Sequence, residues 1–461
     1  MRRAAALFLL FTVAAVGAGC GGGGHAEPPA GAVPNPLRYQ SGARADYERR
    51  VAAGLAHVLY AKSPGGVLAT AARTARWRGP VERAAHDAGV DPDLVEAIVF
   101  LESGGRPEVI AGGTDPRSAA GLTQILASTA TSLLDLRVDV PASQTLGRQV
   151  AAADRAALRD PGTRKARAAA RRGERLRARR RRVDERFDPA KALAATGRYL
   201  EIARRKFERE DLAFVSYHMG IGNLDGVVAA FAGPDAADLP YAQLYFDSTP
   251  LRHAAAHRKL VSFGDDSATY YWRLLAARDV MRAYRTDPGR LSREAALQVA
   301  APSSARALHP PGSTDTFADP GALRDARDAG TLQPLPADRD RLLRPAALAA
   351  LRYLEAGEAG VAPGSPRLAV TRATVDRQSA VGLGEDPEPP PLDTTGYAFE
   401  VARRYGGRAH ADATQFMLDR LTAMDLIAWS RSGPVLDVTA ASGARGLAPW
   451  VGRDGRLRDA S

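Results

Sequence analysis

Residues 91–105 read DPDLVEAIVFLESGG, and this stretch contains both the start and the stop signals of a helix. Asp91 is a capping residue, and Pro92 suits the first helical turn. Ser103-Gly104-Gly105 is typical of a helix end. The apolar positions recur at the helical spacing, at Leu94, Ile98 and Leu101. The stretch therefore predicts an amphipathic helix that ends at a carboxylate, Glu102, followed by small residues that leave room for a ligand.

Glu102 has a position that favours its neutral form. The helix dipole disfavours a negative charge at a helix C-terminus, and partial burial disfavours it further, so both effects raise the pKa of the carboxyl. A carboxyl that is neutral at pH 7 can donate a proton to a leaving oxygen. Taken by itself, however, a glutamate in this position is more typical of an exposed helix end.

Three later segments give Glu102 a context. They are Ser118-Ala119-Ala120-Gly121-Leu122-Thr123-Gln124-Ile125, Phe187-Asp188-Pro189 and Ser216-Tyr217-His218-Met219-Gly220-Ile221-Gly222. Together with Glu102-Ser103, and in this order, they resemble the signature of soluble lytic transglycosylase domains of the lysozyme superfamily. The resemblance covers about 200 residues and implies a mainly α, lysozyme-like catalytic domain without a cofactor.

The resemblance also implies roles for individual residues. Glu102 would be the catalytic acid/base and Ser103 would support the site, while Tyr217 would hydrogen-bond near the carboxyl. The remaining glycan-binding positions are Gly121, Leu122, Gln124 and His218, with Gly121 allowing the backbone to approach the sugar. Two residues depart from the family pattern: Thr123 stands where methionine is common, and His218 where asparagine is usual. We expect Thr123 to reshape a wall of the groove, and His218 either to be structural or to titrate.

The implied reaction uses one carboxylate where ordinary glycosidases use two. In lytic transglycosylases a glutamic acid protonates the oxygen between MurNAc and GlcNAc and then takes a proton from the muramoyl 6-hydroxyl, which attacks the anomeric carbon. The product is 1,6-anhydroMurNAc. If Glu108 or Asp115 were a second carboxylate, the chain would instead be a lysozyme-like muramidase. A third interpretation is a wall-binding scaffold that does not cut the glycan.

A second resemblance lies near the C-terminus. Asp393-Thr394-Thr395-Gly396-Tyr397-Ala398-Phe399-Glu400, with Asp437 later, is similar to the His-x-x-Gly-x-Ala-x-Asp segment and later histidine of zinc D-alanyl-D-alanine carboxypeptidases. Carboxylates stand at all three ligand positions, Asp393, Glu400 and Asp437, whereas zinc prefers imidazole and thiolate. A harder cation such as calcium would suit carboxylates better. The simpler interpretation is a peptidase-like domain that has lost its metal.

Composition divides the chain into regions. Residues 46–285 have helical patterns and few alternating runs, and residues 286–340 are rich in Pro, Ser, Gly and Asp, as in a linker. Residues 341–446 combine helical patterns at 345–355 and 413–424 with short strands at 367–371, 426–429 and 435–438. We predict a mainly α lysozyme-like domain followed by a smaller α+β peptidase-like domain, with a tail at 447–461.

The N-terminus has the layout of an export signal. Arg2 and Arg3 precede an apolar run at 4–16 and Gly17-Ala18-Gly19-Cys20. Cys20 is the only cysteine in the chain. Residues 1–20 resemble a bacterial lipoprotein signal, which implies cleavage after residue 19, lipidation of Cys20 and an anchor at the outer face of the cell membrane. An ordinary signal peptide is the alternative. Residues 20–45, rich in Gly and Pro at first, are predicted to be a flexible tether.

The positive charge is concentrated in one segment. The chain carries a net charge of +11, and Arg164–Arg186 alone holds twelve basic and three acidic residues. Its Ala, Arg and Glu content favours a solvated helical arm, inserted at about 148–186 beside the glycan groove. Because an exported protein meets anionic wall polymers and lipid headgroups, we expect these as partners of the arm, and no nucleic acid.

Overall fold

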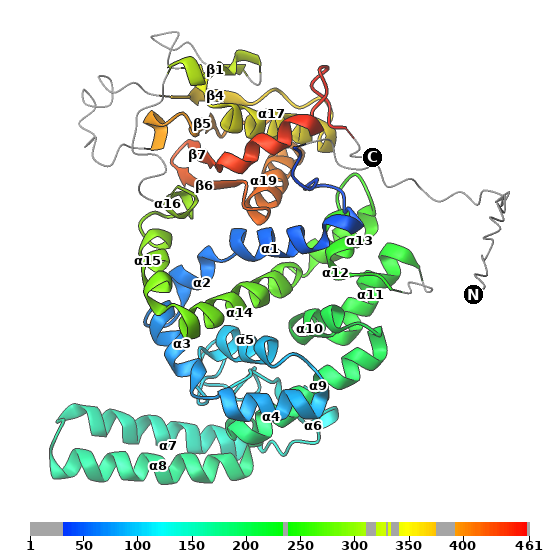
Figure 1. Ribbon diagram of the computed structural model, residues 1–461. Helices are drawn as coiled ribbons and strands as arrows, with labels where there is room; N and C mark the ends of the chain where they lie inside the picture. The colour runs from blue at the N-terminus through cyan, green and yellow to red at the C-terminus, as the bar shows by residue number, and fades with distance from the viewer. Residues whose placement is uncertain are drawn as a thin grey trace, which may run out of the picture.

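The computed structural model describes residues 31–233, 238–309, 320–328, 331–332, 341–374 and 392–458. Most of the first 300 residues are helical (Figure 1). The helices are α1 (Arg44–Gly54), α2 (His57–Lys62), α3 (Val67–Ala75), α4 (Arg78–Ala88), α5 (Pro92–Ser103), α6 (Ala127–Ser132), α7 (Val140–Arg159), α8 (Arg164–Val183), α9 (Pro189–Phe207), α10 (Glu210–Met219), α11 (Ile221–Ala232), α12 (Tyr241–Asp247), α13 (Ala254–Ser262), α14 (Tyr270–Thr286), α15 (Pro288–Gln298) and α16 (Ala305–Leu308).

The C-terminal part is a small α+β region, as predicted. Helices α17 (Pro345–Val361) and α19 (Arg408–Ala423) lie against a sheet whose strand order is β2-β4-β5-β7-β6. All neighbours in this sheet are antiparallel except β2 and β4, which are parallel. The strands are β2 (Thr331–Leu332), β4 (Ala369–Arg372), β5 (Ala398–Ala402), β6 (Ile427–Ser432) and β7 (Val435–Ala440), and β1 (Arg324–Asp325) pairs separately with β3 (Leu342–Leu343).

The helix signals in the sequence are confirmed at α5 and α9. The Asp91 side chain accepts from the Asp93 amide, and Asp188 likewise caps α9. Gly104 ends α5 in the left-handed conformation, with φ of 59°, and donates its amide to the Phe100 carbonyl. Local capping chemistry therefore places Glu102 in the last turn of α5.

The two predicted domains share one hydrophobic core. Buried residues from α1, α14, α17 and α19 belong to a single cluster. Arg420 of α19, 5% exposed, donates hydrogen bonds of 2.8 Å to the Tyr245 and Ser248 carbonyls, and its guanidinium lies 4.2 Å from the centre of the Tyr245 ring. These contacts join the α+β region to the helical body, so the two regions are not independent units.

Three predicted connecting segments are wrong in their described parts. The tether prediction fails for residues 33–39, because Val33, Leu37 and Tyr39 are buried and the Val33 amide donates to the Gly446 carbonyl. The linker prediction fails where α15 packs against α14 and α2. The predicted tail is not free either, because Trp450, at the end of the 3₁₀ helix η8 (Ser442–Trp450), is buried and donates to the Val33 carbonyl.

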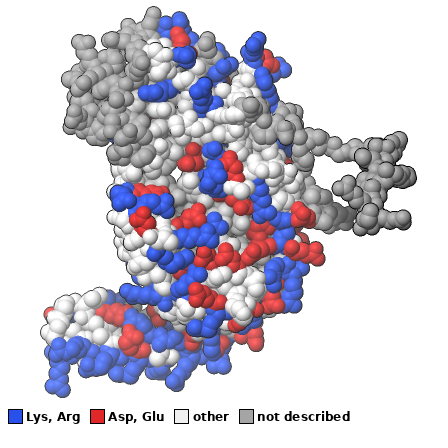
Figure 2. All heavy atoms as spheres, in the orientation of Figure 1, with Lys and Arg blue, Asp and Glu red and all other residues white. Residues whose placement is uncertain are grey.

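The arginine-rich segment forms half of a helical hairpin. Helices α7 and α8 pack side by side and project from the body (Figure 1). The hairpin begins at Val140, earlier than the predicted insertion at 148. Lys and Arg side chains line its outer edge in Figure 2, and most arginines of α8 are exposed. The predicted helical arm is therefore confirmed, although the buried Arg180 and Arg186 belong to the interior.

Arg186 anchors the loop at 116–125. Its side chain is fully buried and pairs with Asp184, which is also fully buried. The guanidinium donates to the Asp184 carboxylate and to the carbonyls of Pro116, Ser118 and Ile125. All five of its N–H groups therefore have an acceptor, and the loop is held against the 3₁₀ helix η2 (Glu185–Phe187).

We predict that Arg186→Met destabilises the fold strongly. The variant leaves Asp184 buried without its cation and three carbonyls without their donor, which costs about 3–5 kcal/mol of unfolding free energy. Arg175→Met, on the exposed side of α8, is the matched control and should change stability by less than about 0.5 kcal/mol. Urea unfolding measures both variants, and equal midpoints would contradict the assigned role of Arg186.

Candidate active site

Glu102 meets a residue from a distant helix. The Tyr270 hydroxyl, at the first residue of α14, donates to Glu102 Oε1 at 2.9 Å. Glu102 is partly exposed, whereas Tyr270 is 2% exposed. Burial raises the pKa of the Glu102 carboxyl, and the nearby His218 charge and the Tyr270 hydrogen bond oppose that shift. The pKa of Tyr270 lies well above its usual value because of burial and the Glu102 charge, so its hydroxyl stays a donor.

His218 lies beside the same tyrosine. Its ring stacks on Tyr270 with centroids 4.9 Å apart and an interplanar angle of 12°. The His218 Nε2 lies 3.0 Å from Asp266 Oδ1, and Arg273 also pairs with Asp266. The hydrogen bond to Asp266 raises the pKa of His218, and the His218 and Arg273 contacts hold the pKa of Asp266 well below its usual range. His218 therefore stacks on the tyrosine that donates to Glu102 and pairs with Asp266 on its other side.

Tyr217 holds the loop in place beside Glu102. Its hydroxyl donates to the Thr123 carbonyl at 2.8 Å and lies 3.1 Å from Thr196 Oγ1. The Thr196 hydroxyl also donates to Thr123 Oγ1 at 2.9 Å. Burial, and then the Glu102 charge, raise the pKa of Tyr217. Thr123 is fully buried, so the expectation that it forms a groove wall is wrong.

Several predicted glycan contacts are interior residues. Ser103 is 1% exposed and donates to the Val99 carbonyl of its own helix, and Leu122 is fully buried. Gly121 is buried with φ of 86°, and a Cβ there would lie 1.9 Å from the Arg186 carbonyl oxygen. Position 121 therefore requires glycine because the η2 backbone passes close to it, and not because a sugar does. Gly121 and Leu122 are therefore interior residues of the loop, and Ser103 is an interior residue of α5.

Gln124 retains one free group. It has a left-handed backbone, with φ of 53°, and its side-chain Nε2 donates to the Val109 and Gly121 carbonyls at 3.0 and 2.8 Å. The residue is partly exposed. Its amide nitrogen therefore fastens the loop, and its Oε1 is the atom left to meet a ligand. Among the predicted binding residues, Gln124, Tyr217 and His218 keep accessible surface, and the charge of Glu102 acts on Tyr217 and His218.

The two alternative carboxylates have other partners. Glu108 lines a cavity of about 490 Å³ between its loop and the α7–α8 hairpin, where Arg181 and Arg180 lie 3.7 and 4.0 Å from it. Asp115 pairs with Arg117 at 3.5 Å. No hydrogen bond or ion pair within the described ranges joins either residue to Glu102.

Sequence reasoning did not identify Asp266, Tyr270 or Arg273 as site residues. The one available signal was the Asp265-Asp266 pair just before α14. His218, Asp265 and Asp266 are also the only His, Cys, Asp and Glu residues of the described chain whose ligand atoms lie within 4.8 Å of one another as a set of three. Because Arg273 already neutralises Asp266, this set has a poor charge balance for a metal ion.

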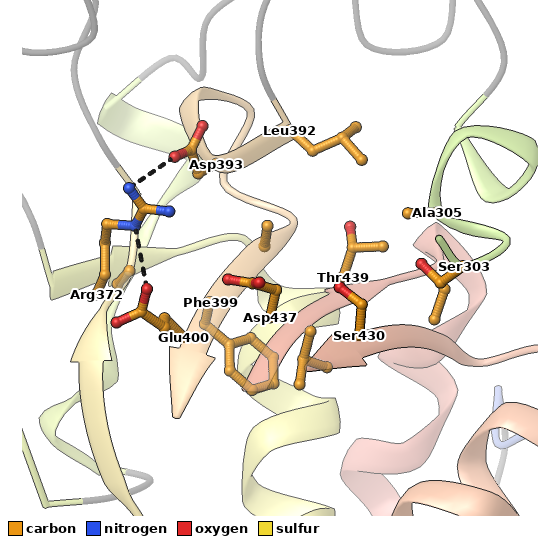
Figure 3. Close-up of a pocket in the computed structure, with 14 residues that line it drawn as sticks. Ser303, Ala305, Arg372, Leu392, Asp393, Phe399, Glu400, Ser430, Asp437 and Thr439 are labelled. Carbon is orange, nitrogen blue, oxygen red and sulfur yellow. Dashed lines mark ion pairs between the residues drawn. The ribbon is translucent and has the colours of Figure 1, made fainter. Parts of the chain in front are cut away.

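The three carboxylates of the second resemblance come together in the α+β region. Asp393, Glu400 and Asp437 line one cavity of about 220 Å³ (Figure 3). Arg372 lies between them, 3.4 Å from Asp393 and 4.0 Å from Glu400.

Comparisons with known proteins add no identification. No protein-family model matches the chain, and no curated protein matches it. No helix in the described ranges has the length and apolar character needed to span a membrane.

We predict that the pKa of His218 lies above 6.5 and that Asp266→Asn lowers it, because the variant removes the accepting carboxylate. A raised pKa in the folded state stabilises the fold below pH 6.5, and this contribution is lost as the pH rises through the folded pKa. Histidine NMR titration measures both midpoints. His257, whose pKa burial lowers to about 4, provides an internal contrast, and a His218 midpoint unaffected by Asp266→Asn would contradict the pairing.

Proposed function

We propose that the chain is a murein lytic transglycosylase that cleaves MurNAc-β-1,4-GlcNAc bonds and forms 1,6-anhydroMurNAc, within a lysozyme-like domain. The observation that carries the proposal is the hydrogen bond from Tyr270 to a partly buried Glu102 whose pKa is raised. The motif order in the sequence supports the same assignment. No metal or organic cofactor is required.

The surroundings of Glu102 suit a carboxyl that acts first as a general acid and then as a general base. Burial favours the neutral form, which can protonate the glycosidic oxygen as the C–O bond breaks. The Tyr270 hydroxyl and the charge of His218 favour the ionised form that remains. That carboxylate then takes the proton of the muramoyl 6-hydroxyl, whose oxygen bonds to the anomeric carbon. The carboxyl is thereby restored, and no water is consumed.

A muramidase would need a second carboxylate placed about 5–9.5 Å from the first for water or covalent attack. Glu108 and Asp115 are committed to arginines, and Asp266 is held by His218 and Arg273. Among the described residues no hydrogen bond joins Glu102 to another carboxylate, and this supports attack by the substrate's own hydroxyl over hydrolysis.

We further propose that the chain is exported and anchored through a lipid on Cys20. This residue lies outside the described residues, so the proposal depends on the sequence pattern of residues 1–20. Mass spectrometry of the mature N-terminus tests it. A lipidated N-terminal Cys20 is expected, and an unmodified cysteine or cleavage elsewhere would contradict the anchor.

The exposed arginines of α8 are proposed to contact anionic wall polymers. They lie on the projecting hairpin (Figures 1 and 2), where their field extends over only about a Debye length at physiological salt. Sedimentation with purified walls should therefore weaken as salt rises. Sedimentation that is insensitive to salt would exclude this surface as the contact.

We predict that Glu102→Gln abolishes cleavage, with a rate at least about 10²–10⁴-fold lower, because glutamine cannot transfer the proton. Glu108→Gln, which alters the carboxylate of the neighbouring cavity, should retain the reaction. Murein digestion followed by mass spectrometry measures both the rate and the product. Reducing-end MurNAc in place of the anhydro sugar would show a hydrolase, and full activity of Glu102→Gln would refute the assignment.

A further inference from the structure

A row of polar residues crosses four strands on one face of the sheet. Arg372 of β4 pairs with Glu400 of β5, Glu400 with Asp437 of β7, and Asp437 with Ser430 of β6. Cross-strand partners project to the same side of a sheet. The neighbouring Val438 is buried, and α17 and α19 contact β7 and β6. The polar row therefore occupies the face that these helices leave free.

This row forms the floor of the 220 Å³ cavity in Figure 3. Asp393 belongs to the 3₁₀ helix η7 (Leu392–Thr394) and also lines the cavity. Thr439 lies two residues after Asp437 on β7 and therefore projects from the same face of the sheet. Ser303, before α16, completes the wall. A cavity of this size accommodates a ligand of a few heavy atoms up to a dipeptide.

The cavity has an excess of negative charge. Arg372 neutralises part of the charge of Asp393 and Glu400, which leaves two of the three carboxylate charges uncompensated. Asp437 has no cationic partner among the described residues at ion-pair distance. Burial, followed by the charge of Glu400, raises the pKa of Asp437. A positive group placed here would relieve this repulsion.

Two buried oxygens in the cavity also have no hydrogen-bond partner within the described chain. Thr439 is 4% exposed and its Oγ1 is unpartnered, and Asp393 Oδ1 is likewise buried without a donor. Buried polar atoms in folded proteins are nearly always paired. Both residues line the cavity, and a ligand whose donors reach these two oxygens would satisfy them.

A metal ion fits this arrangement poorly. The ligand atoms of Asp393, Glu400 and Asp437 do not all lie within 4.8 Å of one another, whereas a bound cation draws its oxygens to within 2.0–2.6 Å of itself. The Arg372 guanidinium would also repel it. An ammonium group is better suited, because its three N–H donors reach acceptors at about 2.7–3.2 Å in divergent directions.

We propose that this cavity binds the primary ammonium group of a small amine or of a short peptide's amino terminus. Asp437 supplies the charge, and Thr439 and Asp393 accept the remaining hydrogen bonds. The site is separate from Glu102 and does not depend on the glycan-cleaving function.

The unfolding temperature of an Asp437→Asn variant distinguishes a loss of the binding site from a loss of the fold. Because the pKa of Asp437 is raised, its negative charge disfavours the folded state, and Asp437→Asn should unfold at the same temperature as the wild type or higher. A loss of binding in that variant would then reflect the site and not the fold. Thr439→Val, of matched shape, removes only the hydroxyl.

The experiment is calorimetric titration of the purified chain with L-alanyl-L-alaninamide, and with its N-acetylated form as the neutral control. We expect saturable binding of the free amine and at least about tenfold weaker binding of the acetylated form. Asp437→Asn should weaken binding about tenfold or more, and Thr439→Val about two- to tenfold. Asp412→Asn, an exposed carboxylate on α19, should bind as the wild type does.

Four results would overturn the proposal. Equal binding of the free and acetylated peptides would remove the ammonium as the recognised group. No saturable binding of the free amine would remove the site. Stoichiometric binding of Ca²⁺ or Zn²⁺ that Asp437→Asn abolishes would identify the cavity as a metal site. If Asp437→Asn lowers the unfolding temperature, Thr439→Val and Ser430→Ala decide, and unchanged affinity in both contradicts the proposal.

Discussion

The buried ion pair between Arg186 and Asp184 is the constraint on which the site depends. The Arg186 guanidinium donates to three carbonyls of the loop at 116–125. The Arg186 backbone also leaves no space for a side chain at Gly121. The loop then presents the Thr123 carbonyl to Tyr217. A buried charge without its partner is strongly unfavourable, so the ion pair stabilises this conformation of the loop and thereby the position of the Thr123 carbonyl that Tyr217 contacts.

Two opposing influences determine the pKa of the Glu102 carboxyl. Burial favours the neutral acid, while the Tyr270 hydroxyl and His218 favour the carboxylate. A single group that is to donate a proton and then accept one needs both forms to be accessible. Tyr270 begins α14, which packs against α5 and α1, and α1 in turn contacts α19 of the α+β region. The position of the hydroxyl therefore depends on the common core of both regions.

Local signals in the sequence predicted the local structure well. Asp91, Asp188 and Gly104 mark helix ends by chemistry confined to a few residues. Helix α5 begins and ends at its signals, and α9 begins directly after Asp188. Tyr270 and Glu102 are 168 residues apart, and nothing local links them. The same reason explains the wrong tether and tail. Gly- and Pro-containing segments look flexible alone, but the Val33 amide donates to the Gly446 carbonyl and the Trp450 indole donates to the Val33 carbonyl. Ser103 and Leu122 are buried, which the motif alone did not indicate, because a motif does not reveal which side of the backbone faces the interior.

The central claim is that Glu102 is a carboxyl with a raised pKa whose ionised form is held by Tyr270. Carboxyl-selective NMR of the chain, with Glu102→Gln used to assign the signal, measures this pKa directly. The account predicts a midpoint above 4.5 that moves higher still in Tyr270→Phe, because that variant removes a donor to the carboxylate. A midpoint at or below 4.5, or one that Tyr270→Phe leaves unchanged, would contradict it.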